Sequence, residues 1–403
     1  MTTGRRFARD GAVIFLGTTL GQVAQLGLLT ILAHETAVAE LGVLLATVGV
    51  LNIVIDVVDF GSGWKLVRDG AARGLTEEDG AVYFTSRVAT GLLAAAGVTV
   101  AGLLIGGHVG STLLLLTPWV VIRVGSQARR ALLQQKSKFT AMAQAQLADR
   151  GLSALIGGTL LLEGASAQLA VGVGYAAGST AALLVGQRLD RSQPLFRRTT
   201  AAKVWTSYAG GRAFGVTLVI TDLLSLDLIL LTWVAGAHQA GLFALPSRVA
   251  LPVTTLATSL PAVAIAQLAG HATHRGAWEL LKAGSRLAVG LSAAGLVAGI
   301  VLAGPLLDLF GGDAYRDAAV PLRLMLFGSL VSVLNQLLLA YLQSRGSEAF
   351  AARVLVPSIV LSLVIVTIAG ALDGATGAAF GYLVCNLVIL VSFASRVRRL
   401  LAG

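Results

Sequence analysis

The stretch AELGVLLATVGVLNIVIDVVDFG at 39–61 decides the fold of this chain. It is almost entirely apolar, and as a helix it is long enough to cross the hydrocarbon layer of a membrane, which takes about 20 residues. Its apolar residues do not alternate with polar ones, so it does not have the pattern of a strand in a membrane barrel. In lipid only helices and closed barrels satisfy the backbone, so the stretch predicts a transmembrane helix.

The composition of the whole chain agrees with a membrane solvent. Of 403 residues, 56% are hydrophobic and 12% are charged, with a mean hydropathy of +0.81. Soluble domains are typically about 25% charged. The net charge of +10 does not indicate nucleic acid, because the basic residues are spread between apolar spans. The single cysteine, Cys385, excludes a disulfide or a thiolate metal site.

Similar apolar runs recur along the chain and predict an all-α polytopic membrane protein with about twelve spans. The first run is longer than a signal-peptide core and is expected to stay as a helix. The predicted spans are 12–32, 39–61, 81–105, 112–134, 140–162, 167–187, 206–234, 240–268, 287–310, 318–343, 351–369 and 376–395.

Basic residues gather in alternate segments between these spans, and the segments on the other side hold only Arg316. Lys and Arg are enriched in cytoplasmic loops, so the pattern predicts a multi-pass protein of the cell membrane with both termini cytoplasmic. The basic segments hold Arg5, Arg6 and Arg9; Lys65, Arg68 and Arg73; Arg129, Arg130, Lys136 and Lys138; Arg188, Arg191, Arg197, Arg198 and Lys203; Arg275, Lys282 and Arg286; Arg345 and Arg353; and Arg396, Arg398 and Arg399.

The longest basic segment follows the sixth span and divides the chain. We expect an N-terminal six-helix lobe at 1–190, a cytoplasmic linker at 191–205 and a C-terminal six-helix lobe at 206–403. The motif AELGV at 39–43 is echoed by QAGLF at 239–243. Such an echo fits two parallel repeats, a plan known among transporters.

Several short motifs resemble the Wzx-like polysaccharide flippases of the multidrug/oligosaccharidyl-lipid/polysaccharide (MOP) exporter superfamily. They are Ile31-Leu32-Ala33, Glu40-Leu41-Gly42, Asp59-Phe60-Gly61, Asp227-Leu228-Ile229-Leu230, Ala240-Gly241-Leu242-Phe243, Leu260-Pro261, Gly304-Pro305-Leu306-Leu307-Asp308-Leu309-Phe310-Gly311 and Arg345-Gly346. The resemblance runs along the whole chain. It implies two pseudo-symmetric six-helix lobes of the MATE/MOP type around a central cavity, lined mainly by the first, second, seventh and eighth spans, and it implies alternating access.

Charged side chains deep in a span usually face a cavity or a partner. A lipid-linked oligosaccharide needs cations for its phosphates and hydrogen-bonding groups for its sugars, and guanidinium groups can hold phosphate through two N–H groups. The candidate substrate residues are therefore Arg248, Arg212, Arg123, Arg150, Gln22 and Gln25. Arg248 and Arg212 are preferred because the resemblance places their spans at the cavity. Three prolines, Pro246, Pro252 and Pro261, also interrupt the eighth span.

Asp222, Asp227 and Asp59 are candidates for coupling to H⁺ or Na⁺. Asp56 and Asp59 share a helix face and would either bind a cation or pair with Arg68. Arg123, Asp149 and Arg150 have an alternative role in internal ion pairs. Thr18, Gly21, Gln22 and Gln25 form a stripe that would contact sugar hydroxyls or serve helix packing. Arg87 and Arg323 lie near span ends, where snorkelling to the surface is expected.

The sequence favours a flippase that moves a polyprenyl-(pyro)phosphate-linked oligosaccharide to the outer leaflet for polysaccharide or cell-wall glycan export. A multidrug/cation antiporter of the same superfamily is the alternative, although the deep charges are rich in arginine. A membrane glycosyltransferase or polymerase fits less well, because the outer turns are too short to build a catalytic site. We expect no enzyme activity, no cofactor or metal, no nucleic acid, and a monomer among membrane lipids. No nucleotide-binding motif is present.

Overall fold

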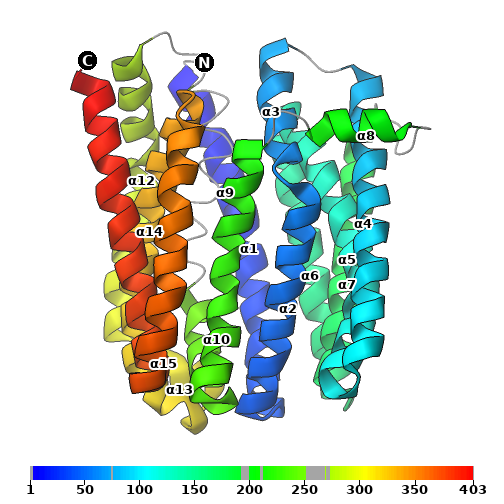
Figure 1. Cartoon of the computed structure of the whole chain (residues 1–403), viewed down its shortest axis with the longest axis vertical. Helices are drawn as coiled ribbons and strands as arrows, with labels where there is room; N and C mark the ends of the chain where they lie inside the picture. Colours follow the sequence, from blue (N-terminus) through cyan, green and yellow to red (C-terminus); the bar gives the residue numbers. More distant parts are fainter. Residues whose placement is uncertain are drawn as a thin grey trace. The chain divides into compact units, whose positions relative to one another are not determined.

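The computed structural model describes residues 3–73, 76–191, 199–208, 212–250, 268 and 273–402, and every regular element in these ranges is a helix (Figure 1). The first half contains α1 (Thr3–Glu35), α2 (Val38–Asp59), α3 (Ser62–Arg73), α4 (Glu77–Ile105), α5 (Gly107–Gln135), α6 (Phe139–Leu162) and α7 (Ala167–Leu189). Then follow α8 (Ala201–Tyr208), α9 (Arg212–Asp222), the 3₁₀ turn η1 (Leu223–Ser225), α10 (Leu226–Ala235) and a helical stretch at 237–250. The last elements are α12 (His274–Val301), α13 (Ala303–Gly311), η2 (Asp313–Ala318), α14 (Ala319–Ser344) and α15 (Glu348–Ala402).

Seven helices in the described part of the chain are long and apolar enough to cross a membrane. The prediction of an all-helical membrane protein is confirmed. α15 holds the two last predicted spans, because its backbone leaves helical geometry at Asp373 and Gly374. The backbone N–H of Ala375 donates to Gln239 Oε1 at 3.1 Å and fixes this turn.

The structure corrects several predicted boundaries. The predicted seventh span, 206–234, is not one helix, since it contains the end of α8, all of α9, the turn η1 and α10. α3 continues the chain after the second span as a separate helix. α12 already begins at His274, inside the segment between the predicted spans 240–268 and 287–310. Most of the eighth span, with Pro252 and Pro261, lies outside the described residues.

The chain divides into two compact units. The C-terminal unit comprises Met1–Thr19, Thr36–Ala46 and Leu223–Gly403, and the N-terminal unit comprises Leu20–Glu35 and Thr47–Asp222. The predicted lobe boundaries near 190 and 206 stay a prediction. In the C-terminal unit α15 packs on α10 and α14, and α14 also packs on α12.

The two echoing motifs of the sequence contact one another in the C-terminal unit. A methyl group on Gly42 would lie 3.3 Å from the backbone nitrogen of Gly241, and one on Gly241 would collide with Val38. Small residues allow backbones this close at membrane depth. The glycines of the echo therefore serve the packing of α2 against the 237–250 helix.

Close packing in the N-terminal unit also rests on glycines. α6 and α7 make the most extensive contact of the unit, and α5 packs on both α4 and α7. A methyl group on Gly174 would lie 2.8 Å from the Ser153 carbonyl oxygen, and one on Gly178 would collide with the Asp149 carbonyl. This close approach brings α7 within hydrogen-bonding distance of the polar residues at the centre of α6.

Candidate functional site

The centre of the candidate site is Asp149 in α6, which holds partners on two neighbouring helices. The Arg123 guanidinium of α5 donates to Asp149 Oδ2, and the Ser179 hydroxyl of α7 donates to Asp149 Oδ1 at 3.0 Å. The side chains of Arg123 and Asp149 are 16% and 6% exposed. The ion pair anticipated as an alternative for Arg123 is therefore present, with Asp149 as its carboxylate.

Arg150, the next residue of α6, points to a different neighbour. Its guanidinium donates to Gln25 Oε1 of α1. The stem of Arg150 runs past Gly21, where a methyl group would lie 2.8 Å from Arg150 Cδ. Gln22 is also buried on this part of α1. The structure thus brings together two predicted substrate residues, Arg150 and Gln25.

Two further charged residues adjoin Asp149. Arg130, near the end of α5, lies within electrostatic range of Arg123, Asp149, Arg150 and Asp56. Asp56, near the end of α2, is within range of Arg123 and Arg130. Asp56, Arg123, Arg130, Asp149 and Arg150 are together called the Asp149 cluster. These five described residues supply three guanidinium groups and two carboxylates, so positive charge is in excess by one.

Sequence reasoning missed Arg130 and Ser179. The charge pattern predicts Arg130 to lie in a basic segment between spans, but Arg130 follows Arg123 by two helical turns and so shares its face of α5. The spacing of seven residues from Arg123 could therefore have predicted that Arg130 belongs to the same site. Ser179 carried none, because serines are common at helix contacts in membranes.

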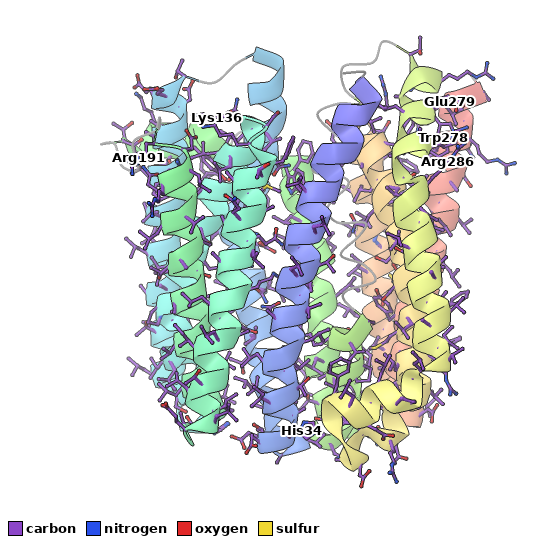
Figure 2. All side chains as sticks on the ribbon, turned by 180° about the vertical axis from the view of Figure 1, so that it is seen from behind. His34, Lys136, Arg191, Trp278, Glu279 and Arg286 are labelled. Carbon is purple, nitrogen blue, oxygen red and sulfur yellow. The ribbon has the colours of Figure 1, made fainter. Side chains whose placement is uncertain are left out.

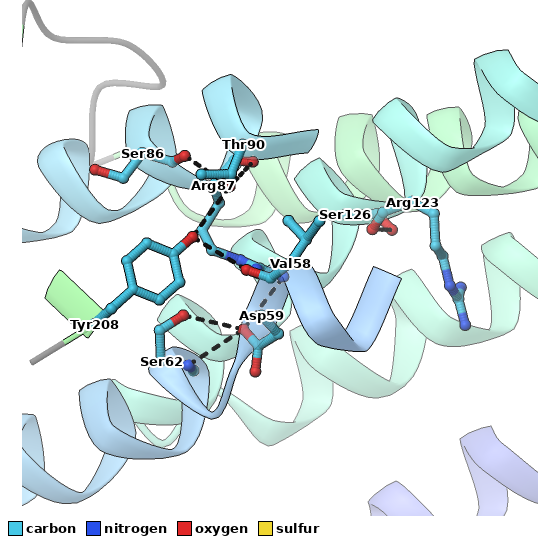
Figure 3. Close-up of polar contacts among 10 residues, drawn as sticks. Val58, Asp59, Ser62, Ser86, Arg87, Thr90, Arg123, Ser126 and Tyr208 are labelled. Atoms are coloured by element: carbon cyan, nitrogen blue, oxygen red, sulfur yellow. Dashed lines mark hydrogen bonds and ion pairs between the residues drawn. The ribbon is translucent and has the colours of Figure 1, made fainter. Parts of the chain in front are cut away.

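A second polar network lies where α2 ends (Figure 3). Arg87 Nη2 lies 3.2 Å from Asp59 Oδ1, and that oxygen also accepts from the Ser62 hydroxyl at 3.2 Å and the Gly63 N–H at 3.3 Å. Arg87 is only 1% exposed. The prediction that Arg87 snorkels to the surface is wrong, because its guanidinium is fully buried beside a carboxylate.

Tyr208, the last residue of α8, completes this network. Its hydroxyl donates to the Val58 carbonyl of α2 at 3.1 Å and lies 3.0 Å from Thr90 Oγ1 of α4 (Figure 3). α8 packs on α4, and its Trp205 is exposed. No sequence signal singled out Tyr208.

A third network joins the α5–α6 turn to the end of α7. Lys138 Nζ and Lys136 Nζ lie 2.9 Å and 3.1 Å from the carboxylate oxygens of Asp190, and Arg129 donates to the Asp190 carbonyl. Asp190 is 2% exposed. These contacts link the α5–α6 turn and α5 to the end of α7.

The predicted residues of the second half are only partly described. Arg248 is half-buried in the 237–250 helix and acts electrostatically on Asp227 at the start of α10. Asp227 is also within range of Tyr382 in α15. The side chains of Arg212 and Asp222 lie outside the described residues. Among the described residues, no three His, Cys, Asp or Glu side chains are placed to hold a metal ion.

Comparison with known proteins identifies the fold. The family model described as MatE matches residues 236–368, which is less than half of the chain. An outward-facing multidrug resistance MATE family transporter of the MOP superfamily superposes with a TM-score of 0.75 at 14% identity, covering 100% of both chains. A MATE transporter from Vibrio cholerae gives 0.73 at 10% identity, over 99% of each chain.

A third structure, a MOP superfamily transporter from Pyrococcus furiosus, gives a TM-score of 0.75 at 12% identity over 99% of each chain. No curated protein matches. The chain therefore has the fold of the MATE transporters of the MOP superfamily, a fold of multi-pass membrane transporters.

Proposed function

We propose that the chain is a flippase that carries a polyprenyl-(pyro)phosphate-linked oligosaccharide from the inner to the outer leaflet by alternating access. The observation that carries this proposal is the excess of guanidinium groups in the Asp149 cluster. A surplus positive charge inside a membrane protein is costly, and a site that keeps one is suited to an anionic ligand. Arginine binds phosphate bidentately and stays charged at physiological pH.

The other residues of the path have proposed roles in the same transport. Gln22 and Gln25 would bind sugar hydroxyls, and Arg248 and Arg212 would bind phosphate from the second half. Asp227 and Asp222 would couple the cycle to H⁺ or Na⁺. Asp59 is the weaker candidate for coupling, because Arg87 and two further donors already occupy its Oδ1.

A multidrug/cation antiporter is the second candidate, favoured by the fold neighbours described as multidrug resistance transporters. An antiporter for cations should have carboxylates in excess at its site, and the Asp149 cluster has the opposite sign. The Pyrococcus furiosus relative is described as having a binding pocket of reverse polarity that suggests a different function. That description is a precedent for a change of substrate on this fold.

An enzyme fits the structure less well. The turn between α4 and α5 is the single residue Gly106, and that between α6 and α7 spans only 163–166. On the side predicted to face outward, these turns leave no room for a catalytic loop.

The test is headgroup translocation in proteoliposomes, with a fluorescent polyprenyl-pyrophosphate oligosaccharide and an external quencher. Arg130→Gln removes one guanidinium group of the Asp149 cluster, and Arg188→Gln removes an exposed charge at the end of α7. We expect flipping by the wild type and by R188Q. In R130Q it should fall about tenfold, the equivalent of 1.4 kcal/mol of phosphate binding. Absence of flipping together with proton- or sodium-coupled dye export would establish the antiporter instead.

A further inference from the structure

Asp149 is the carboxylate of α6 that forms the ion pair with Arg123 of α5. It is a buried anion beside three guanidinium groups, those of Arg123, Arg130 and Arg150. Arg123 pairs with it directly, and Arg130 and Arg150 lie within electrostatic range of it.

We infer that Asp149 is an exchangeable counter-ion that holds Arg123 in the empty transporter and yields it to the phosphate of the bound substrate. This inference rests on the proposed function. In this inference the carboxylate of Asp149 regulates the binding of phosphate at the site.

The two oxygens of Asp149 have separate partners, which makes such an exchange feasible. Oδ2 accepts from Arg123, while Oδ1 accepts from the Ser179 hydroxyl at 3.0 Å. When Arg123 turns to a phosphate, the carboxylate still keeps the hydrogen bond from Ser179. An ionised carboxylate left without any donor in this environment would be strongly destabilising.

The backbone around Asp149 is held in place, whereas its carboxylate can lose and regain Arg123 as a partner. The Ser153 hydroxyl donates to the Asp149 carbonyl at 2.6 Å, and α7 packs directly on that carbonyl through Gly178. Arg123 is the more exposed member of the pair. The arginine is therefore the partner that moves, and Asp149 is the fixed group to which it returns.

An exchange of this kind solves a problem that any phosphate carrier in a membrane must face. Its arginines need an anion when the substrate is absent, because an unpaired guanidinium at membrane depth is unfavourable. They must also release the phosphate on the far side. A competing internal carboxylate weakens binding of the substrate but speeds its release.

The inference predicts opposite effects on binding and on transport when the carboxylate is neutralised. In Asp149→Asn, Arg123 loses its competitor, so affinity for a short-chain prenyl pyrophosphate should rise about tenfold. The rate of flipping should fall, because the phosphate is released slowly. The control is Glu163→Gln, which makes the same change of charge at the exposed end of the same helix, and which should alter neither quantity.

Binding is measured in detergent with purified full-length protein and geranyl pyrophosphate, and flipping is measured in proteoliposomes. If the wild type binds and D149N is folded but binds no more tightly, the counter-ion exchange is wrong while the flippase stands. If the wild type neither binds nor flips, the proposed function itself fails. Should D149N not fold, Ser179→Ala decides. A carboxylate without its second donor competes more strongly for Arg123, so the affinity for geranyl pyrophosphate should fall. A lowered affinity in S179A would support the exchange, and an unchanged or raised one would overturn it.

Discussion

Gly21 of α1 is the residue that allows Arg150 to reach its partner. The arginine stem crosses α1 at this position, and a methyl group there would lie 2.8 Å from Cδ and 3.2 Å from Cβ of Arg150. Neither carbon is the mobile tip of the side chain, so the added atom cannot be accommodated by a small rotation. The space at Gly21 is therefore required by the geometry of Arg150.

We predict that Gly21→Ala displaces Arg150 from Gln25 and lowers the flipping rate. Overpacking of this kind costs about 1–3 kcal/mol of stability, which thermal unfolding in detergent would detect. Gly27→Ala is the matched control, since no atom lies within 4 Å of a methyl group at Gly27 on the same helix. The control should gain up to about 1 kcal/mol from its better helix propensity. Equal effects of the two substitutions would contradict the role given to Gly21.

Individual site residues could be predicted from the sequence only where their chemistry is unusual for a membrane. Arg123 and Arg150 stood out as charges within apolar spans, and the structure places both next to Asp149. Their partners could not be predicted, because helix rotation and contact are set by glycines distributed along α6 and α7. Arg87 was misjudged for the same reason, since sequence position alone does not reveal that Asp59 faces it.

α8 is a short helix that Tyr208 and Lys203 connect to its neighbours. The helix has eight residues, too few to be stable alone in water. Its Tyr208 hydroxyl bridges α2 and α4, and Lys203 Nζ lies 3.3 Å from Glu78 at the start of α4. The aromatic Trp205 on its exposed face suits a membrane–water interface.

We predict that Tyr208→Phe loosens α8 without unfolding the helices beneath it. The substitution removes two hydrogen bonds, each contributing about 0.5–1.5 kcal/mol. Amide hydrogen exchange in α8 should become faster, while exchange in α6 and α7 stays the same. Tyr175→Phe is the control, because the ring of Tyr175 packs on Trp119 at a centroid distance of 5.2 Å and keeps that contact. Unchanged exchange in α8 would show that the tyrosine does not hold it.

The long helices were predictable because lipid imposes one rule on each of them, a continuous apolar run with its backbone paired internally. The break in the seventh span was not, since the sequence at 223–225 is as apolar as its surroundings. η1 falls where the chain passes from the N-terminal unit to the C-terminal unit. η1 packs on α10 and α15, and a hydropathy pattern does not record such packing.

For the chain as a whole, the composition indicates that the solvent is lipid and the motifs indicate the fold, but neither identifies the substrate. Fold neighbours at 10–14% identity share the architecture with this protein over nearly its full length. At such identity the residues that choose a substrate are free to differ. The sign of the charge in the Asp149 cluster is therefore better evidence on the substrate than the architecture is.

The orientation of the chain in the membrane provides the last test. Glu163, in the turn between α6 and α7, and Arg191, just after the end of α7, are both exposed. Figure 2 shows Lys136 and Arg191 at the same end of the N-terminal unit and His34 at the opposite end. The positive-inside pattern predicts that the end with Lys136 and Arg191 is cytoplasmic.

We predict that cysteines introduced at Glu163 and Arg316 react with an impermeant maleimide in intact cells. Those at Arg191 and Arg398 should react only after permeabilisation. Cys385 is the single native cysteine and is buried, so a Cys385→Ser background gives a clean label. Arg398 follows Arg316 by three predicted spans, an odd number that must place them on opposite sides. Labelling of both in intact cells would therefore refute the span count, whereas labelling of Arg191 and Arg398 in place of Glu163 and Arg316 would reverse the orientation and leave the count intact.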